Sequence, residues 1–145
     1  MQPRAPESGL PAMTPQPPLC VVMLLCQDVV IDEDRETISV IGIFEDVHSD
    51  RFPVKLRRIF VYSELTEGRG SMTVLLRFFR RTADDLDGEE ITSFGANVTF
   101  PSPRYLERFI VEVPGLELIQ PGEYRAILYA NGKYLAERRL SAHIS

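Results

Sequence analysis

The sequence is poor in the residue types on which most catalytic and metal sites depend. Its 145 residues include two histidines, two cysteines and no tryptophan. Neither His48 nor His143 has a spacing to another ligand residue that is typical of a zinc site. No Gly-x-Ser-x-Gly turn and no glycine-rich phosphate loop is present in the sequence. These absences favour a non-enzymatic protein, and no cofactor is predicted.

The two cysteines give no basis for a disulfide. Cys20 and Cys26 fall within one apolar run, so we expect them on a single strand, roughly 20 Å apart at about 3.3 Å per residue. A disulfide needs Cα atoms within about 7 Å. Two buried free thiols are typical of a reducing compartment, so we expect a cytoplasmic protein in which both cysteines are small core residues.

No apolar run is long enough to cross a bilayer as a helix. The longest, residues 19–26, has eight residues, whereas a spanning helix needs about 20. No basic segment of note precedes this run, and no small-residue cleavage pattern follows it. A lipoprotein signal also fails, because there the apolar run comes before the cysteine. The sequence therefore predicts no membrane association.

The sequence also has fewer basic than acidic residues, 16 against 21. The formal net charge of −5 disfavours a nucleic-acid surface as the main feature, since such domains are usually basic. The acidic run at residues 84–90 fails as a calcium loop: with Gly88 at the sixth position, Ala83 occupies the first and Phe94 the twelfth, where acids are required. No metal site is predicted. The carboxylates that remain as weak candidates are Asp85, Asp87 and Glu89.

The chain begins with a proline-rich segment. Six of its eleven prolines lie in residues 1–18, and proline lacks an N–H donor and fixes φ, so this stretch cannot join a helix or a sheet ladder. We predict a disordered tail over residues 1–18. Residues 19–145 are long enough for a single domain with a core of its own.

Apolar-rich runs and turn clusters alternate through the rest of the chain, and no convincing helical period occurs beyond one turn near residues 105–108. Gly42 lies inside a strand-like run and indicates a bulge or a close backbone approach. A loop is expected at residues 48–53. The predicted strands cover residues 19–31, 37–45, 54–65, 71–81, 90–100, 108–113 and 115–119, followed by a C-terminal hairpin. This pattern predicts an all-β fold, namely an antiparallel β-sandwich of about seven to eight strands.

The C-terminal hairpin is the clearest structural signal. Asn131-Gly132 between two apolar runs is typical of a two-residue type I′ turn, which places Ala130 opposite Lys133 and Leu128 opposite Leu135. Leu140 is then out of phase with the predicted core face. Either the last strand is bulged near residues 138–139, which we favour, or both faces of the hairpin are covered.

Two further residues of the hairpin carry structural predictions. Gly122 follows Pro121 and supplies the turn that precedes the hairpin. Tyr124 stands where immunoglobulin-type sandwiches place a corner tyrosine, whose hydroxyl bonds to upstream backbone. An ordinary half-buried tyrosine is the alternative. The predicted structural residues of this region are Gly122, Tyr124, Asn131 and Gly132.

Several of these motifs together carry a resemblance. Residues 24–30 (LLCQDVV), 37–44 (TISVIGIF), 52–53 (FP) and the PGEY…NG pattern of residues 121–132 resemble an uncharacterised bacterial family of small all-β domains of unknown function. The resemblance covers roughly residues 19–145. It implies an immunoglobulin-like sandwich and supplies no catalytic residues.

Function is predicted from surplus apolar surface. A sandwich strand needs one buried face, yet residues 19–26 are apolar throughout, and Leu75 and Phe79 lie opposite the predicted core face of their strand. We therefore expect a non-enzymatic interaction or structural module that contacts another protein or itself. The alternative is a small-molecule or glycan-binding sandwich that uses Phe52, Tyr105 or Tyr134 as a stacking platform.

One basic feature stays open at this point. Arginine pairs occur at residues 57–58, 80–81 and 138–139, and adjacent strand residues point to opposite faces, so each pair places one arginine on either side. A groove near Arg77 and Arg81 that binds an anion remains an alternative to simple protection of strand edges.

Overall fold

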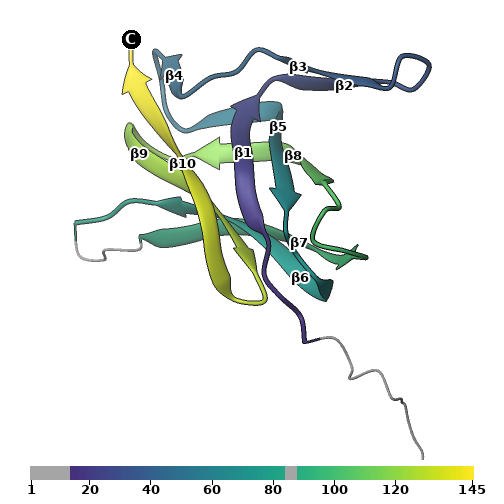
Figure 1. Ribbon diagram of the computed structural model, residues 1–145. Helices are drawn as coiled ribbons and strands as arrows, with labels where there is room; N and C mark the ends of the chain where they lie inside the picture. The colour runs from purple at the N-terminus through teal and green to yellow at the C-terminus, as the bar shows by residue number, and fades with distance from the viewer. Residues whose placement is uncertain (1–13, 84–87) are drawn as a thin grey trace, which may run out of the picture.

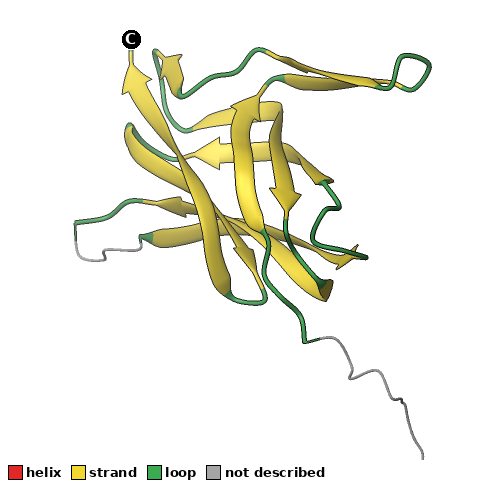
Figure 2. Ribbon diagram, in the orientation of Figure 1, coloured by secondary structure: helices red, strands yellow, loops and turns green. Residues whose placement is uncertain are grey.

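A computed structural model describes residues 14–83 and 88–145, and in these residues the protein is built from ten strands without a helix (Figures 1 and 2). The strands are β1 (Leu19–Cys26), β2 (Asp28–Asp32), β3 (Thr37–Ile41), β4 (Asp46–Ser49), β5 (Val54–Thr66), β6 (Gly70–Arg80), β7 (Glu89–Phe100), β8 (Glu107–Leu118), β9 (Gly122–Ala130) and β10 (Lys133–Ile144). The all-β prediction is confirmed.

Two sheets enclose the main core. One has the order β1-β5-β8 and the other the order β4-β10-β9-β6-β7, with β4 parallel to β10 and the other neighbours antiparallel. Alternate residues of both sheets meet between them. The largest fully buried side chains are Leu25, Val61, Leu65, Val113 and Leu118 from the first sheet and Val74, Leu76, Phe78, Phe100, Tyr124, Leu128 and Leu140 from the second.

The third sheet is a two-stranded hairpin that the sequence pattern did not predict. Residues 19–31, expected as one strand, divide at Gln27 into β1 and β2, and β2 pairs with β3 rather than continuing the first sheet. The expected strand at residues 37–45 ends at Ile41. Figure 1 shows the β2–β3 hairpin projecting beyond the rest of the domain; it is called the arm below.

Gly42 explains where the arm ends. Its φ of +69° suits glycine, and a Cβ there would lie 2.6 Å from the side-chain oxygen of Gln27. The close approach predicted from the sequence therefore exists, but it turns the chain out of the arm. The chain then enters β4, which overlaps the loop expected at residues 48–53 only at residues 48 and 49. This strand pairs with the last strand, with His48 opposite His143.

The remaining strand boundaries differ from expectation in one region. The two short strands expected at residues 108–113 and 115–119 form a single strand, β8, which pairs with β5 along its whole length. The expected helical turn near residues 105–108 is absent from the described structure, because Glu107 already pairs with Leu65 of β5.

The hairpin of β9 and β10 has the predicted turn and a bulge in a different place. Asn131 and Gly132 both have positive φ (47° and 80°), and Ala130 pairs with Lys133. The register shifts between Tyr134 and Ala136, so Ala136, rather than Leu135, opposes Leu128. The phase change thus occurs at Leu135 and not at residues 138–139.

Candidate interaction surface

Strand β1 is apolar on both faces because each face meets a different layer. Met23 and Leu25 enter the main core between the sheets, whereas Cys26 lies in a second cluster on the outer side of the β1-β5-β8 sheet. Val22 and Leu24 border that second cluster and stay partly exposed. The excess of apolar residues in β1 is therefore accounted for in part by the arm and in part by uncovered surface.

The second cluster forms where the arm lies over the outer side of this sheet. Its buried members are Cys26, Phe60 and Tyr62. Partly buried residues pack against them from the sheet (Val22, Leu24, Ile110) and from the arm (Val29, Ile38, Val40). We call these six residues, together with Ile31 of the arm, the outer apolar face. An isolated two-stranded hairpin is at best marginally stable, so packing on Phe60 and Tyr62 holds the arm.

The arm carries exposed aliphatic side chains on both of its faces. Val29 pairs with Val40 and Ile31 with Ile38, which places these four side chains on one face. Ile31 is nevertheless 59% exposed. Val30 (45%) and Ile41 (48%) are exposed on the other face of the arm, and Ile43 (57%) is exposed just beyond β3. Three large exposed aliphatic side chains on one projecting hairpin, with a fourth just beyond it, are unusual for a surface without a partner.

Charged residues surround the outer apolar face. Arg58 pairs with Glu112 at 2.8 Å and its guanidinium lies 4.8 Å from the centroid of the Phe60 ring. Arg108 lies 3.9 Å from Glu64, and the hydroxyl of Tyr62 donates a hydrogen bond to Glu64. An apolar centre inside a polar margin is the usual anatomy of a protein–protein interface.

Tyr62 should make the stability of this face depend on pH in the alkaline range. Burial raises the pKa of its hydroxyl, and the hydrogen bond to Glu64 raises it further. A pKa that is higher in the folded than in the unfolded state contributes stability below about pH 10, where unfolded tyrosine is neutral. That contribution is lost as the pH rises through the folded-state pKa. We expect the free energy of unfolding to fall above about pH 10, and the Tyr62→Phe variant to lose less.

The measurement is urea denaturation between neutral and strongly alkaline pH. The control is Tyr129→Phe, which removes a half-buried tyrosine from the other sheet. Equal alkaline losses in wild type and Tyr62→Phe would contradict the assignment to Tyr62.

A cleft with two arginines adjoins the arm. It has a volume of about 440 Å³ and is lined by Gln27, Phe44, Asp46, Val47, Leu56, Arg57, Arg58 and Ile59; we call it the arginine cleft. Phe44, Val47 and Leu56 pack against the main core and form an apolar floor. Arg57 is exposed and makes no ion pair within the described residues, whereas Arg58 is paired with Glu112. Both arginines are exposed.

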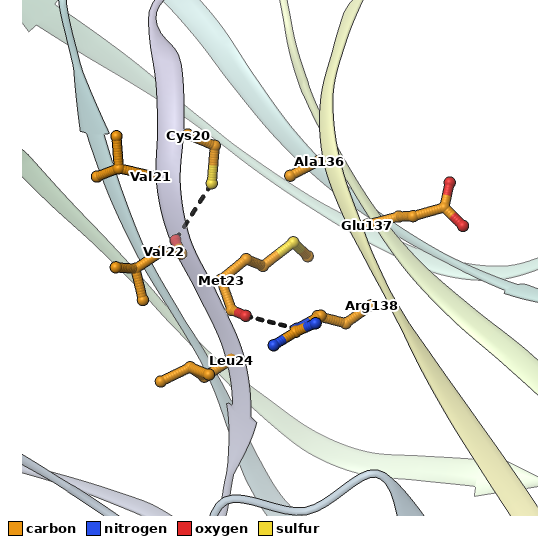
Figure 3. A pocket seen from close by; sticks show the side chains of 8 residues that line it. All are labelled: Cys20, Val21, Val22, Met23, Leu24, Ala136, Glu137 and Arg138. Atoms are coloured by element: carbon orange, nitrogen blue, oxygen red, sulfur yellow. Dashed lines mark hydrogen bonds between the residues drawn. The ribbon is translucent and has the colours of Figure 1, made fainter.

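A second cleft lies where β1 meets β10. Its volume is about 360 Å³, and Figure 3 shows Arg138 pointing from β10 toward β1, while Glu137 points away. Arg138 donates a hydrogen bond of 2.8 Å to the carbonyl of Met23, and Cys20 donates one to the carbonyl of Val22. An inward-pointing charge that occupies backbone groups protects an open strand edge. We interpret this cleft as a structural junction between β1 and β10 and not as a binding site.

The comparison with known proteins assigns the chain to a family whose function is unknown. Residues 21–143 match a family of unknown function, DUF6941. The chain belongs to this family. None of the curated proteins matches the DUF6941 domain.

Solved structures resemble the domain only loosely. An alkylpurine DNA glycosylase, AlkC, of Pseudomonas fluorescens is 8% identical with a TM-score of 0.46, over 83% of this chain and 30% of that one. A β-glucosidase of Listeria innocua is 7% identical with a TM-score of 0.44, over 84% of this chain and 16% of that one. The DUF6941 domain thus spans less than a third of either protein, and this degree of likeness carries no functional argument.

The histidines of the DUF6941 domain lie together at the end of the β4–β10 pair. The rings of His48 and His143 stack with centroids 4.8 Å apart, and Nε2 of His143 is 2.8 Å from Oδ1 of Asp46. The side chains of His143 and Asp46 are 46% and 58% exposed. Within residues 14–83 and 88–145, no three His, Cys, Asp or Glu side chains are grouped to hold a metal ion.

The weak metal candidates are not brought together in the described part of the domain. Asp85 and Asp87 lie outside the described residues. Glu89 pairs with Arg80 at 2.8 Å. The proposed anion groove is likewise occupied by protein carboxylates, because Arg77 pairs with Glu90 at 2.5 Å and Arg81 with Glu123 at 3.0 Å.

The cysteines and the hairpin tyrosine have structural settings. Cys20 and Cys26 are free thiols, and burial raises the pKa of both, which disfavours the reactive thiolate at neutral pH. Tyr124 is buried, and its hydroxyl donates a 2.6 Å hydrogen bond to the carbonyl of Gln120 and accepts one from the Gln120 N–H. This contact is the upstream backbone bond expected of a corner tyrosine.

The three aromatic residues considered for ligand stacking lie apart. Phe52 packs against the main core. Tyr105 is exposed and meets Phe100 edge-on at 6.4 Å between centroids, while Tyr134 of β10 donates a hydrogen bond to Glu137. In the described part of the domain, no helix is long and apolar enough to cross a membrane.

Proposed function

We propose that the DUF6941 domain is a non-enzymatic contact module that binds a protein, either another chain or a second copy of itself, through the arm and the outer apolar face. The observation that carries the proposal is the exposure of Val30, Ile31 and Ile41 on a projecting hairpin beside a partly covered sheet face. Covering these side chains would supply the apolar centre of an interface, and the ion pairs around them would form its rim.

The finer description of fold and location belongs to the same proposal. Two facing sheets and the Tyr124 corner contact support an immunoglobulin-like sandwich. Two unpaired thiols support a reducing, cytoplasmic setting. The alternative, a small-molecule or glycan site, has support in the arginine cleft, whose volume of about 440 Å³ suits a ligand. The exposed arm favours the contact module.

A photo-crosslinking residue at position 31, in the organism's own cells, tests the proposal. We expect one discrete protein adduct from position 31 and none from position 119, where Ile119 is similarly exposed outside the arm. The protein identified by mass spectrometry should then bind the Ile31→Asp variant at least about tenfold more weakly than wild type, because a charge replaces a buried anchor. Equal adducts from both positions, or unchanged affinity of Ile31→Asp, would refute the contact surface.

A further inference from the structure

The arm and the arginine cleft are chemically complementary. We propose that the arginine cleft receives the arm tip of a second copy of this chain, each copy inserting its arm into the cleft of the other in a two-fold symmetric dimer. This inference rests on the proposed contact function and identifies the partner.

The arm tip combines one large apolar side chain with a negative surround. Ile31 is 59% exposed and precedes a turn that carries four carboxylates, Asp32, Glu33, Asp34 and Glu36, against the single cation Arg35. Arg35 lies 3.8 Å from Asp32, and their side chains are 83% and 42% exposed. The tip therefore keeps a net negative charge around Ile31.

The arginine cleft has the opposite combination. Its floor is apolar, formed by Phe44, Val47 and Leu56, and its margin carries Arg57 and Arg58. Asp46 is the one carboxylate among the lining residues, and it is engaged with His143. Arg57 has no ion-pair partner in the described part of the chain, so an incoming carboxylate would complete its pairing.

The position of the two features suits a reciprocal contact. Gln27 lines the arginine cleft and is also the residue between β1 and β2, so the arm starts at the margin of the cleft. The arm then projects away from its own domain (Figure 1). A two-fold axis that crosses midway along the arm would carry each arm tip to the cleft of the other copy and close the assembly, because an isologous interface uses the same patch twice. In that arrangement the carboxylates of each arm tip would face the arginines of the other copy's cleft.

The test is a charge exchange between the two patches, followed by sedimentation velocity. Wild type should dimerise. Arg57→Glu and Asp34→Lys should each weaken self-association at least tenfold, because the first places glutamate opposite the acidic tip and the second places lysine opposite Arg57 and Arg58. Mixing the two variants should restore dimers as a heterodimer, since each arm then meets a cleft residue of opposite charge. Arg139→Glu, at an exposed arginine of β10, is the control and should leave association unchanged.

The outcomes separate this inference from the proposed function. A wild type that stays monomeric at several hundred micromolar, or a variant mixture that does not recover dimers, would overturn the arm-to-cleft dimer. The contact function would still stand if the position-31 crosslink identified a different protein. If position 31 gave no specific adduct and wild type were also monomeric, both would fail. Circular dichroism of each variant confirms that the fold is retained.

Discussion

Leu76→Ala should lower the free energy of unfolding by about 3 kcal/mol. Leu76 is fully buried between Leu128 of β9 and Phe94 of β7 on the inner side of the five-stranded sheet. Removing its side chain forfeits apolar burial and leaves a cavity that a closely packed core fills only in part. Urea denaturation monitored by circular dichroism would measure the loss.

The neighbouring residue is the matched control. Leu75 follows the opposite face of the same strand and is only half-buried, beside Gly95 and Tyr129. Leu75→Ala should therefore cost about 1 kcal/mol or less. Equal losses for the two variants would contradict the assignment of the inner face of β6 as the main core.

Phe60→Ala should destabilise the domain by about 3 kcal/mol and should also release the arm. Phe60 is 7% exposed in the second cluster, where Val29, Ile38 and Val40 of the arm pack. Without this ring the arm loses its main support, and a two-stranded hairpin does not persist alone. Hydrogen exchange should then show faster exchange of the arm amides than of those in β6 and β9.

Phe79→Ala separates the local effect from the global one. Phe79 is equally buried, at 5% exposed, but it lies on β6, in the other sheet, beneath Arg77. This variant should lower overall stability without selective loss of protection in the arm. Retained arm protection in Phe60→Ala would show that the second cluster does not hold the arm.

The hairpin shows how far sequence patterns reach. Asn131-Gly132 fixed the turn because few residues other than asparagine and glycine adopt positive φ easily. The need for a phase change was also readable, since Leu140 and Leu128 had to share a face. The position of the bulge could not be predicted, because one extra residue anywhere before Leu140 brings Leu140 onto the same face as Leu128. The sequence even favours the wrong position, since Leu135 looks like a core residue and Arg138 like a surface residue.

The arm could not be predicted from sequence patterns. β1 and β2 read as one continuous strand because both are apolar, and nothing local to Gln27 indicates that the second half joins a different sheet. The phase of the apolar residues likewise runs through Gly42 toward β4. Pairing partners are set by packing between distant segments, which a single sequence does not encode locally. The surplus of apolar residues predicted a contact surface, but the arginine cleft, assembled from three separate segments, could be seen only in the fold.

The pairing of β4 with β10 has a consequence for how the chain folds. Asp46 pairs with Ser141 and Ser49 with Ile144, so the edge of the five-stranded sheet is completed by residues far apart in the sequence. Non-local pairing of this kind slows folding, because a long loop must close before any contact is gained. During synthesis, β1 to β5 emerge before the strands of the second sheet that cover them, and the core-facing residues of β1 and β5 stay exposed in that interval. Such a chain is vulnerable to aggregation at this stage and would benefit from a chaperone that shields its first half.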